Sequence, residues 1–169
     1  MSIKSFFGVD RSSKHLTTVV NTFASIPLLE LKLVRFKDKT HKTPKFRFWV
    51  AFRFEDESFC VLNTITTQID YIGRVYKNDE YGANSVVVIP NGDFLPPLYE
   101  TSYIDCNIKS INYKKYRELA EDIIDWNDGL IVCKEEIPQF IKEKIIKAIL
   151  NSKYTSNDIK KAFTEKPAA

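Results

Sequence analysis

The clearest pattern in the chain is a strict alternation of apolar and polar or smaller residues over positions 46–54. The even-numbered positions are apolar: Phe46, Phe48, Val50, Phe52 and Phe54. The odd-numbered positions are Arg47, Trp49, Ala51, Arg53 and Glu55. A period of two predicts a β-strand with one buried face, so we expect the second set to face solvent. The acidic stretch 55–58 then predicts a tight turn, and 59–65 a returning strand, which makes 46–65 a hairpin.

Further strands are predicted on both sides of this hairpin. Residues 28–36 alternate between leucines and charged residues. Residues 84–89 are rich in valine, and 90–93 have the composition of a turn. Residues 102–106 and 108–111 are expected to form two short strands. Between these strands, residues 68–83 are ambiguous, because their apolar spacing suits a short helix that Gly73 weakens.

Helices are predicted near the two ends of the chain. Residues 12–25 carry one apolar stripe, and Pro27 ends it. The apolar residues of 113–124 recur at helical spacing and predict a second helix. A third helix is expected to start at Pro138, since proline suits a first helical turn. A last short helix is expected to be capped by Thr155 or Ser156.

The order of these elements predicts an α+β fold. Closely spaced strands with short turns favour a small antiparallel barrel or a curled sheet over a parallel sheet. At 169 residues the chain suits a single domain. We expect residues 1–40 to form a helix and strand extension, 41–112 the barrel core, and 113–164 a helical tail.

Composition and charge narrow the function classes. The chain has 25 Lys and Arg against 22 Asp and Glu, a formal net charge of +3, which permits a nucleic-acid partner without requiring one. Only five glycines are present, which argues against a glycine-rich loop around a nucleotide. The sequence contains no P-loop, no dinucleotide-binding fingerprint and no His-Glu-x-x-His motif.

The cysteines and the N-terminus bear on compartment and cofactors. Cys60, Cys106 and Cys133 are widely spaced and odd in number, which favours free thiols in a cytoplasmic protein. The two histidines, His15 and His41, lie far from the cysteines in sequence, so we expect neither a metal site nor a cofactor. No secretory signal and no apolar run long enough for a membrane helix is visible.

Two segments carry a family resemblance. The first ends in Thr64-Ile65-Thr66-Thr67-Gln68, and the second contains Ser102-Tyr103-Ile104 followed by Asn107-Ile108-Lys109-Ser110-Ile111-Asn112. These motifs resemble the MazF/PemK-like family of bacterial toxins, which are SH3-like β-barrels of type II toxin–antitoxin systems. Gly92-Asp93 and residues 152–163 are similar to a longer PemK-like branch of that family. The resemblance implies an SH3-like barrel, here with an N-terminal helix and C-terminal helices.

The resemblance also implies an activity, namely metal-independent cleavage of single-stranded RNA through the substrate's own 2′-hydroxyl. Arg47 corresponds to the family's arginine, whose guanidinium would stabilise the phosphorane oxygens, and Thr66 and Thr67 correspond to its hydroxyl pair. The further residues expected to bind the substrate are Lys45, His41, Arg53 and Gln68. The implied partners are RNA, a cognate antitoxin protein and, in a homodimer, a second copy of the chain.

Other interpretations of the same residues stay open. Arg47 and Arg53 suit ordinary solvent-facing positions of a strand, and threonines are frequent in strands without any catalytic role. His41 and the basic stretch 37–45 suit an ordinary loop. The family's Gly-x-Arg-Pro loop is missing, since this chain reads Thr43-Pro44-Lys45-Phe46-Arg47. The alternative function is therefore a catalytically inactive PemK-like barrel, a protein- or nucleic-acid-binding module such as a phage or mobile-element regulator.

Overall fold

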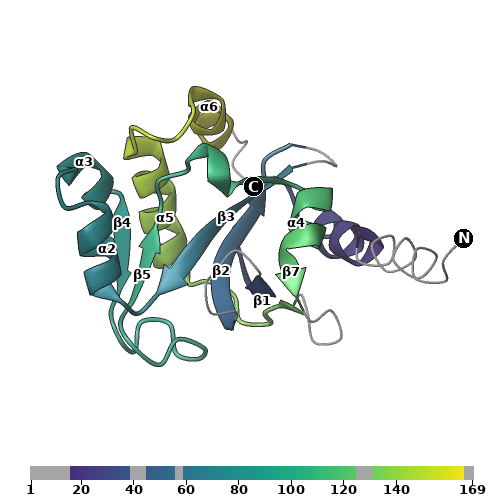
Figure 1. Cartoon of the computed structure of the whole chain (residues 1–169), viewed down its shortest axis with the longest axis horizontal. Coiled ribbons are helices and arrows are strands. Elements are labelled where there is room, and N and C mark those ends of the chain that lie inside the picture. The colour runs from purple at the N-terminus through teal and green to yellow at the C-terminus, as the bar shows by residue number, and fades with distance from the viewer. Residues whose placement is uncertain (1–15, 39–44, 56–58, 125–130, 166–169) are drawn as a thin grey trace, which may run out of the picture.

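The structure, a computed structural model, describes residues 16–38, 45–55, 59–124 and 131–165. Antiparallel strands form its centre, in the order β4-β5-β3-β2-β1-β7, and helices lie on both sides of them (Figure 1). The strands are β1 (Lys32–Asp38), β2 (Phe46–Arg53), β3 (Phe59–Thr66), β4 (Val86–Ile89), β5 (Ser102–Asp105), β6 (Tyr113–Lys115), β7 (Ile123–Ile124) and β8 (Ile131–Val132). The helices are one over residues 16–24, then α2 (Ile69–Val75), α3 (Glu80–Ala83), the 3₁₀ helix η1 (Ser110–Asn112), α4 (Tyr116–Asp122), α5 (Gln139–Asn151) and α6 (Asn157–Glu165).

Strand β3 joins two parts of the sheet because it changes partners along its length. It pairs with β2 from Cys60 to Thr64, in a register that sets Trp49 opposite Thr64. Its last residues, Ile65 and Thr66, pair with β5 instead. The predicted hairpin 46–65 is thus confirmed, but its two strands separate near the start of β2.

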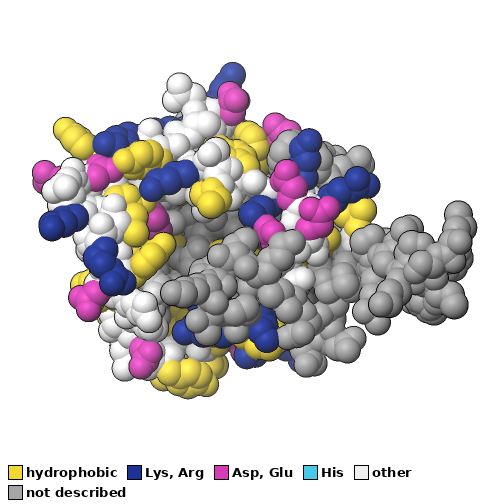
Figure 2. All heavy atoms as spheres, in the orientation of Figure 1, with side chains coloured by type: hydrophobic (Ala, Val, Ile, Leu, Met, Phe, Trp, Pro, Cys, Tyr) yellow, Lys and Arg dark blue, Asp and Glu magenta, His cyan; other side chains and the backbone are white. Residues whose placement is uncertain are grey.

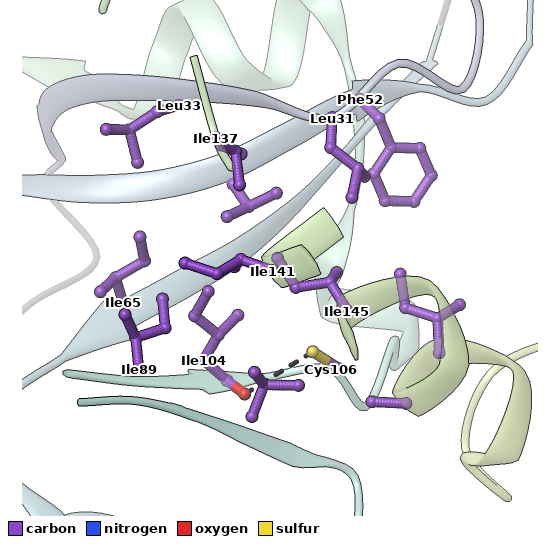
Figure 3. Packing of buried hydrophobic residues seen from close by; sticks show 14 of the residues in the cluster. Leu31, Leu33, Phe52, Ile65, Ile89, Ile104, Cys106, Ile137, Ile141 and Ile145 are labelled. Atoms are coloured by element: carbon purple, nitrogen blue, oxygen red, sulfur yellow. Dashed lines mark hydrogen bonds between the residues drawn. The ribbon is translucent and has the colours of Figure 1, made fainter. Parts of the chain in front are cut away.

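The two faces of the sheet are covered by different apolar clusters. On one face, Val50 and Phe52 pack with α5, whose Ile141, Ile145 and Ile149 recur every four residues and are almost fully buried (Figure 3). On the other face, a second buried cluster joins the helix over residues 16–24 to α4. Its members are Val19, Phe23, Ile26, Val34, Phe36, Trp49, Ala51, Tyr116, Leu119, Ala120 and Ile123. The sheet is therefore the middle layer of three.

This second cluster corrects one expectation for β2. Trp49 and Ala51 do not face solvent, since their exposed fractions are 7% and 0%. The Trp49 ring stacks on Phe36 with centroids 4.8 Å apart. Only the ends of this face, at Arg47 and Arg53, are partly exposed. The alternation predicted the strand correctly, but it could not reveal the helices that cover its second face.

Several predicted elements are confirmed, and two are wrong. The helix over 16–24, β1, β2, β4, β5, α5 and α6 lie where the sequence patterns placed them, and α2 resolves the ambiguous stretch as a helix. Residues 108–111 are not a strand, because the Asn112 side chain accepts the Lys109 N–H (2.9 Å) and closes a 3₁₀ turn. Residues 113–115 pair with β3, and the helix starts only after Lys115, whose N–H the Glu118 carboxylate accepts (2.8 Å).

The expected barrel is not closed. Within the described residues, β4 and β7 end the strand order and no pairing joins them. The architecture shown is a mixed α+β fold built on small antiparallel sheets. The sheet also extends beyond the range 41–112, since β1, β7 and β8 lie outside it. Among the described helices, none combines the length and the apolar character that crossing a membrane requires.

Candidate functional site

A cleft of about 720 Å³ opens where β3 leaves β2. Helix α2 contributes Tyr71, Ile72 and Val75 to its lining, and α4 contributes Leu119 and Asp122. Figure 1 shows α2 at the left and α4 at the right, with β2 and β3 between them. The first residues of β2 and the last residues of β3 form the base of the fork. The topology therefore places one end of the β2–β3 hairpin in this cleft.

Five of the residues predicted from the sequence line this one cleft. They are Lys45, Arg47, Thr66, Thr67 and Gln68. The guanidinium of Arg47 donates a long hydrogen bond to the Lys45 carbonyl (3.4 Å). Thr66 Oγ1 accepts the Gln68 N–H (3.1 Å), which fixes the turn between β3 and α2. The structure thus brings together Arg47 and both threonines from segments about 20 residues apart.

The other two predicted residues are not part of this lining. Arg53 lies six positions beyond Arg47 on β2, which corresponds to about 20 Å along a strand. Its carbonyl accepts the Leu29 N–H (2.8 Å) at the far end of the sheet. Arg53 is therefore separated from the cleft, and its role in substrate binding stays a prediction that this cleft does not support. His41 lies outside the described residues.

The cleft also contains charged groups that sequence reasoning did not single out. Lys114 forms an ion pair with Asp122 (2.5 Å), so these two charges neutralise each other. Lys109 and Asp105 line the cleft as well. The sequence offered a weak signal for the cations, because Lys109, Lys114 and Lys115 are closely spaced. It offered no comparable signal for Asp105, which stands alone on a short strand.

A buried hydrogen-bond network fixes the wall of the cleft around Asp105. Tyr76 Oη donates to Asp105 Oδ2 (2.6 Å), and Asn107 Nδ2 donates to Asp105 Oδ1 (2.8 Å). The same amide reaches the Gly82 carbonyl (2.8 Å), and its oxygen accepts from Ser152 Oγ (2.6 Å). Burial, aided by the bond to Asp105, raises the pKa of Tyr76 far above its ordinary value, so this hydroxyl stays protonated.

The balance of charge and apolar surface indicates what the cleft can bind. Beyond the Lys114–Asp122 pair, the lining holds three cations, Lys45, Arg47 and Lys109, and one carboxylate, Asp105. Apolar side chains of the lining are also exposed, with Tyr71 at 50% and Ile111 at 74%. Cations beside exposed flat or apolar groups suit a ligand that combines anionic and aromatic parts. Away from the cleft, basic and acidic side chains intermingle on the face seen in Figure 2.

Burial disfavours the reactive thiolate at both cysteines whose side chains the structure describes. Cys106 is fully buried, and burial raises the pKa of its thiol, which disfavours the nucleophilic thiolate. Cys133 is half-buried, and burial raises its thiol pKa as well. Among the described residues, no group of three or more His, Cys, Asp and Glu side chains is placed to hold a metal ion.

Comparisons with protein-family models, with curated proteins and with solved structures found no match. The likeness of the Thr64–Gln68 and Ser102–Asn112 segments to MazF/PemK-like toxins therefore has no support from overall similarity. The residues that line the cleft are therefore the basis for proposing a function.

Proposed function

We propose that this chain binds single-stranded RNA in the cleft between α2 and α4 and cleaves it without a metal ion, as the toxin of a type II toxin–antitoxin system. The observation that carries the proposal is the convergence of Arg47, Thr66 and Thr67 on one cleft. These residues come from two strands that separate there. The motif resemblance selected the same three residues without any knowledge of the cleft.

The lining chemistry supports RNA as the substrate. A guanidinium presents paired N–H donors that match two phosphate oxygens, and it keeps its charge in proteins. Lys45 and Lys109 supply further positive charge for the backbone. Tyr71 offers an exposed ring on which an unpaired base can stack. A duplex hides its base faces, so this combination favours a single strand.

In the proposed reaction the substrate supplies its own nucleophile. The ribose 2′-oxygen bonds to the adjacent phosphorus as its proton passes to solvent water, and the bond from phosphorus to the 5′-oxygen breaks. The 5′-oxygen takes up a proton from solvent water, so the products are a 2′,3′-cyclic phosphate and a 5′-hydroxyl. Arg47 stabilises the charge on the phosphorane oxygens, and a threonine hydroxyl holds a nonbridging oxygen. No metal ion and no cofactor takes part.

The proposal extends to fold and assembly. We interpret the sheet as an opened relative of an SH3-like barrel, because β3 is shared between two groups of strands as long curled strands of small barrels are. An antitoxin that covers the cleft and a homodimer belong to the same proposal. For the antitoxin, the test is whether a co-expressed acidic partner protein blocks RNA cleavage.

The test uses purified protein, labelled single-stranded RNA and excess EDTA. We expect cleavage products with a cyclic phosphate, and no cleavage of an RNA whose 2′-hydroxyls are replaced by 2′-O-methyl groups. Arg47→Ala should lower the cleavage rate by about 10²- to 10³-fold, the usual effect of removing one donor to a developing anion. Arg53→Ala is the matched control, because Arg53 lies on the same strand outside the cleft. A folded protein that cleaves no RNA refutes the catalytic proposal.

One observation favours a second candidate, RNA binding without cleavage. Both carboxylates of the lining already accept hydrogen bonds or pair with a cation, Asp105 from Tyr76 and Asp122 from Lys114. Neither is thus assigned as the base that removes the 2′-proton. Binding that depends on Arg47, without any product from the unmodified RNA, would establish this candidate and exclude the first.

A further inference from the structure

A row of alternating tyrosine rings and lysine ammonium groups leads away from the cleft. Lys109 Nζ lies 5.0 Å from the ring centroid of Tyr76 and 4.8 Å from that of Tyr154. Lys153 Nζ lies 5.1 Å from the ring centroids of both Tyr154 and Tyr81. We call these five residues the tyrosine–lysine row. Because Lys109 also lines the cleft, the row begins at the cleft wall.

The outer part of the row is open to solvent. Tyr81 is 71% exposed and Tyr154 is 38% exposed, whereas Tyr76 is buried at the inner end. The side chain of Lys153 is half exposed. A smaller hollow lies beside Tyr154, and its other lining residues are Phe54, Ile108, Ser110, Tyr113, Ser156 and Asp158. Residues 108–111 contribute to both hollows, Lys109 and Ile111 to the cleft and Ile108 and Ser110 to the smaller hollow.

One acidic residue, Asp79, contacts the row and reduces its positive charge. Asp79 accepts a hydrogen bond from Tyr154 Oη and pairs with Lys153 through Oδ1 (3.1 Å). The same carboxylate accepts the Gly82 N–H (3.1 Å) and so caps α3. In the free protein Asp79 therefore offsets the charge of Lys153. A phosphate that reaches Lys153 has to compete with this carboxylate.

We propose that the tyrosine–lysine row is a second binding segment for the same RNA strand, which occupies the cleft with one stretch of nucleotides and continues over Lys109 to Tyr154 and Tyr81. This inference rests on the proposed RNA-binding function. Single-stranded nucleic acids bind to surfaces where cations follow the backbone and exposed rings stack on bases. The two lysines and the exposed tyrosines Tyr154 and Tyr81 provide both groups side by side.

The experiment measures affinity against RNA length. The probe is fluorescein-labelled oligouridine in which every 2′-hydroxyl is 2′-O-methylated, so that it binds without being cut. Lengths of about four and about twelve nucleotides bracket the range of single-strand site sizes, and fluorescence anisotropy gives Kd at one fixed salt concentration. We expect the longer strand to bind at least about tenfold more tightly, since it gains more than one additional stacked base.

Substitutions separate the row from the cleft. Tyr81→Ala should weaken binding of the longer strand by about fivefold or more, and leave the shorter strand unchanged. Tyr99→Ala is the matched control, because Tyr99 is equally exposed, at 70%, and is not part of the row. Asp79→Asn should tighten binding of the longer strand alone, since asparagine still caps α3 but no longer neutralises Lys153.

The outcomes distinguish this inference from the proposed function. If the short strand binds in an Arg47-dependent manner and length brings no gain, the row is not an RNA segment while the cleft proposal stands. If neither strand binds, the proposed function itself fails. If a polyglutamate peptide displaces the longer strand as effectively as unlabelled RNA does, the row recognises acidic protein segments, and the RNA inference is overturned.

Discussion

Asn107 is the residue whose loss should test the described architecture most directly. Its side chain is 2% exposed and connects four segments: α2 through Tyr76, α3 through the Gly82 carbonyl, β5 through Asp105, and the end of α5 through Ser152. Replacing Asn107 with alanine removes these bonds at once. The backbone bond from its N–H to Asp105 Oδ1 (3.0 Å) is kept.

The magnitude follows from the groups that would be left buried. Ser152 is fully buried and its hydroxyl loses its acceptor, whereas the Gly82 carbonyl still accepts the Ser85 N–H (3.2 Å). An unsatisfied buried polar group costs about 1–3 kcal/mol and each further lost hydrogen bond about 1 kcal/mol, so Asn107→Ala should lower the free energy of unfolding by roughly 2–4 kcal/mol. Because domains of this size are stable by about 5–15 kcal/mol, the variant should lose a measurable share of its stability.

Urea unfolding followed by circular dichroism measures this difference. Ser152→Ala should cost less, and the double variant should cost at least about 1 kcal/mol less than the two single losses together, because the residues share one bond. Asn151→Ala, at an exposed neighbouring position, is the control and should change the free energy of unfolding by no more than about 0.5 kcal/mol. A loss below about 1 kcal/mol for Asn107→Ala, or strict additivity with Ser152→Ala, would refute the network.

Four other outcomes are expected. Gly82→Ala should destabilise the fold by about 1–3 kcal/mol, because a new Cβ would lie 2.3 Å from the Tyr76 ring. Gly73→Ala, with no atom within 4 Å of the new Cβ, should stabilise α2 by up to about 1 kcal/mol, and thermal unfolding distinguishes these opposite signs. Phe52→Ala should cost about 3–5 kcal/mol in urea unfolding, since the ring is fully buried against Phe163. Hydrogen bonds from Tyr154 and the Gly82 N–H lower the pKa of Asp79 from 3.8 to about 2, so its contribution to stability is complete above about pH 4 and is lost as the pH falls through about 2. The stability difference between the native chain and Asp79→Asn should therefore shrink over that range, and a constant difference would contradict the assignment.

The sequence predicted individual helices and strands better than it predicted which elements pack against each other. Alternation over 46–54 predicted β2 because the backbone period is local, and the isoleucines spaced by four predicted α5 for the same reason. The sequence did not predict that helices would cover Trp49, because burial of this second face of β2 depends on elements far away in sequence. The 3₁₀ turn at 110–112 was missed since one side chain, that of Asn112, competes with strand pairing.

The candidate site was predictable only in part, again for a physical reason. Arg47 and Thr66 occur in segments whose short motifs were visible, and their common cleft agrees with the hypothesis that joined them. Arg53 was also predicted to bind the substrate and lies on the same face of β2 as Arg47, but the length of the strand separates it from the cleft. Asp105 could not be chosen, because its place depends on the buried Asn107 network rather than on any sequence pattern, and the spacing of Lys109 gave only a weak signal.

The change of partner by β3 explains why the cleft forms where it does. After Thr64 this strand pairs with β5, whereas the first residues of β2 stay with β1. Two diverging strands leave room at the fork, and α2 follows directly from β3 while α4 packs on the opposite side, so helices wall the space without filling it. Side chains at the fork, such as Arg47 and Thr66, are held by strand backbone rather than by a loop. If the proposed function holds, this rigid placement limits the loss of entropy when Arg47 binds a phosphate, so the fork is where we expect the phosphate to be held.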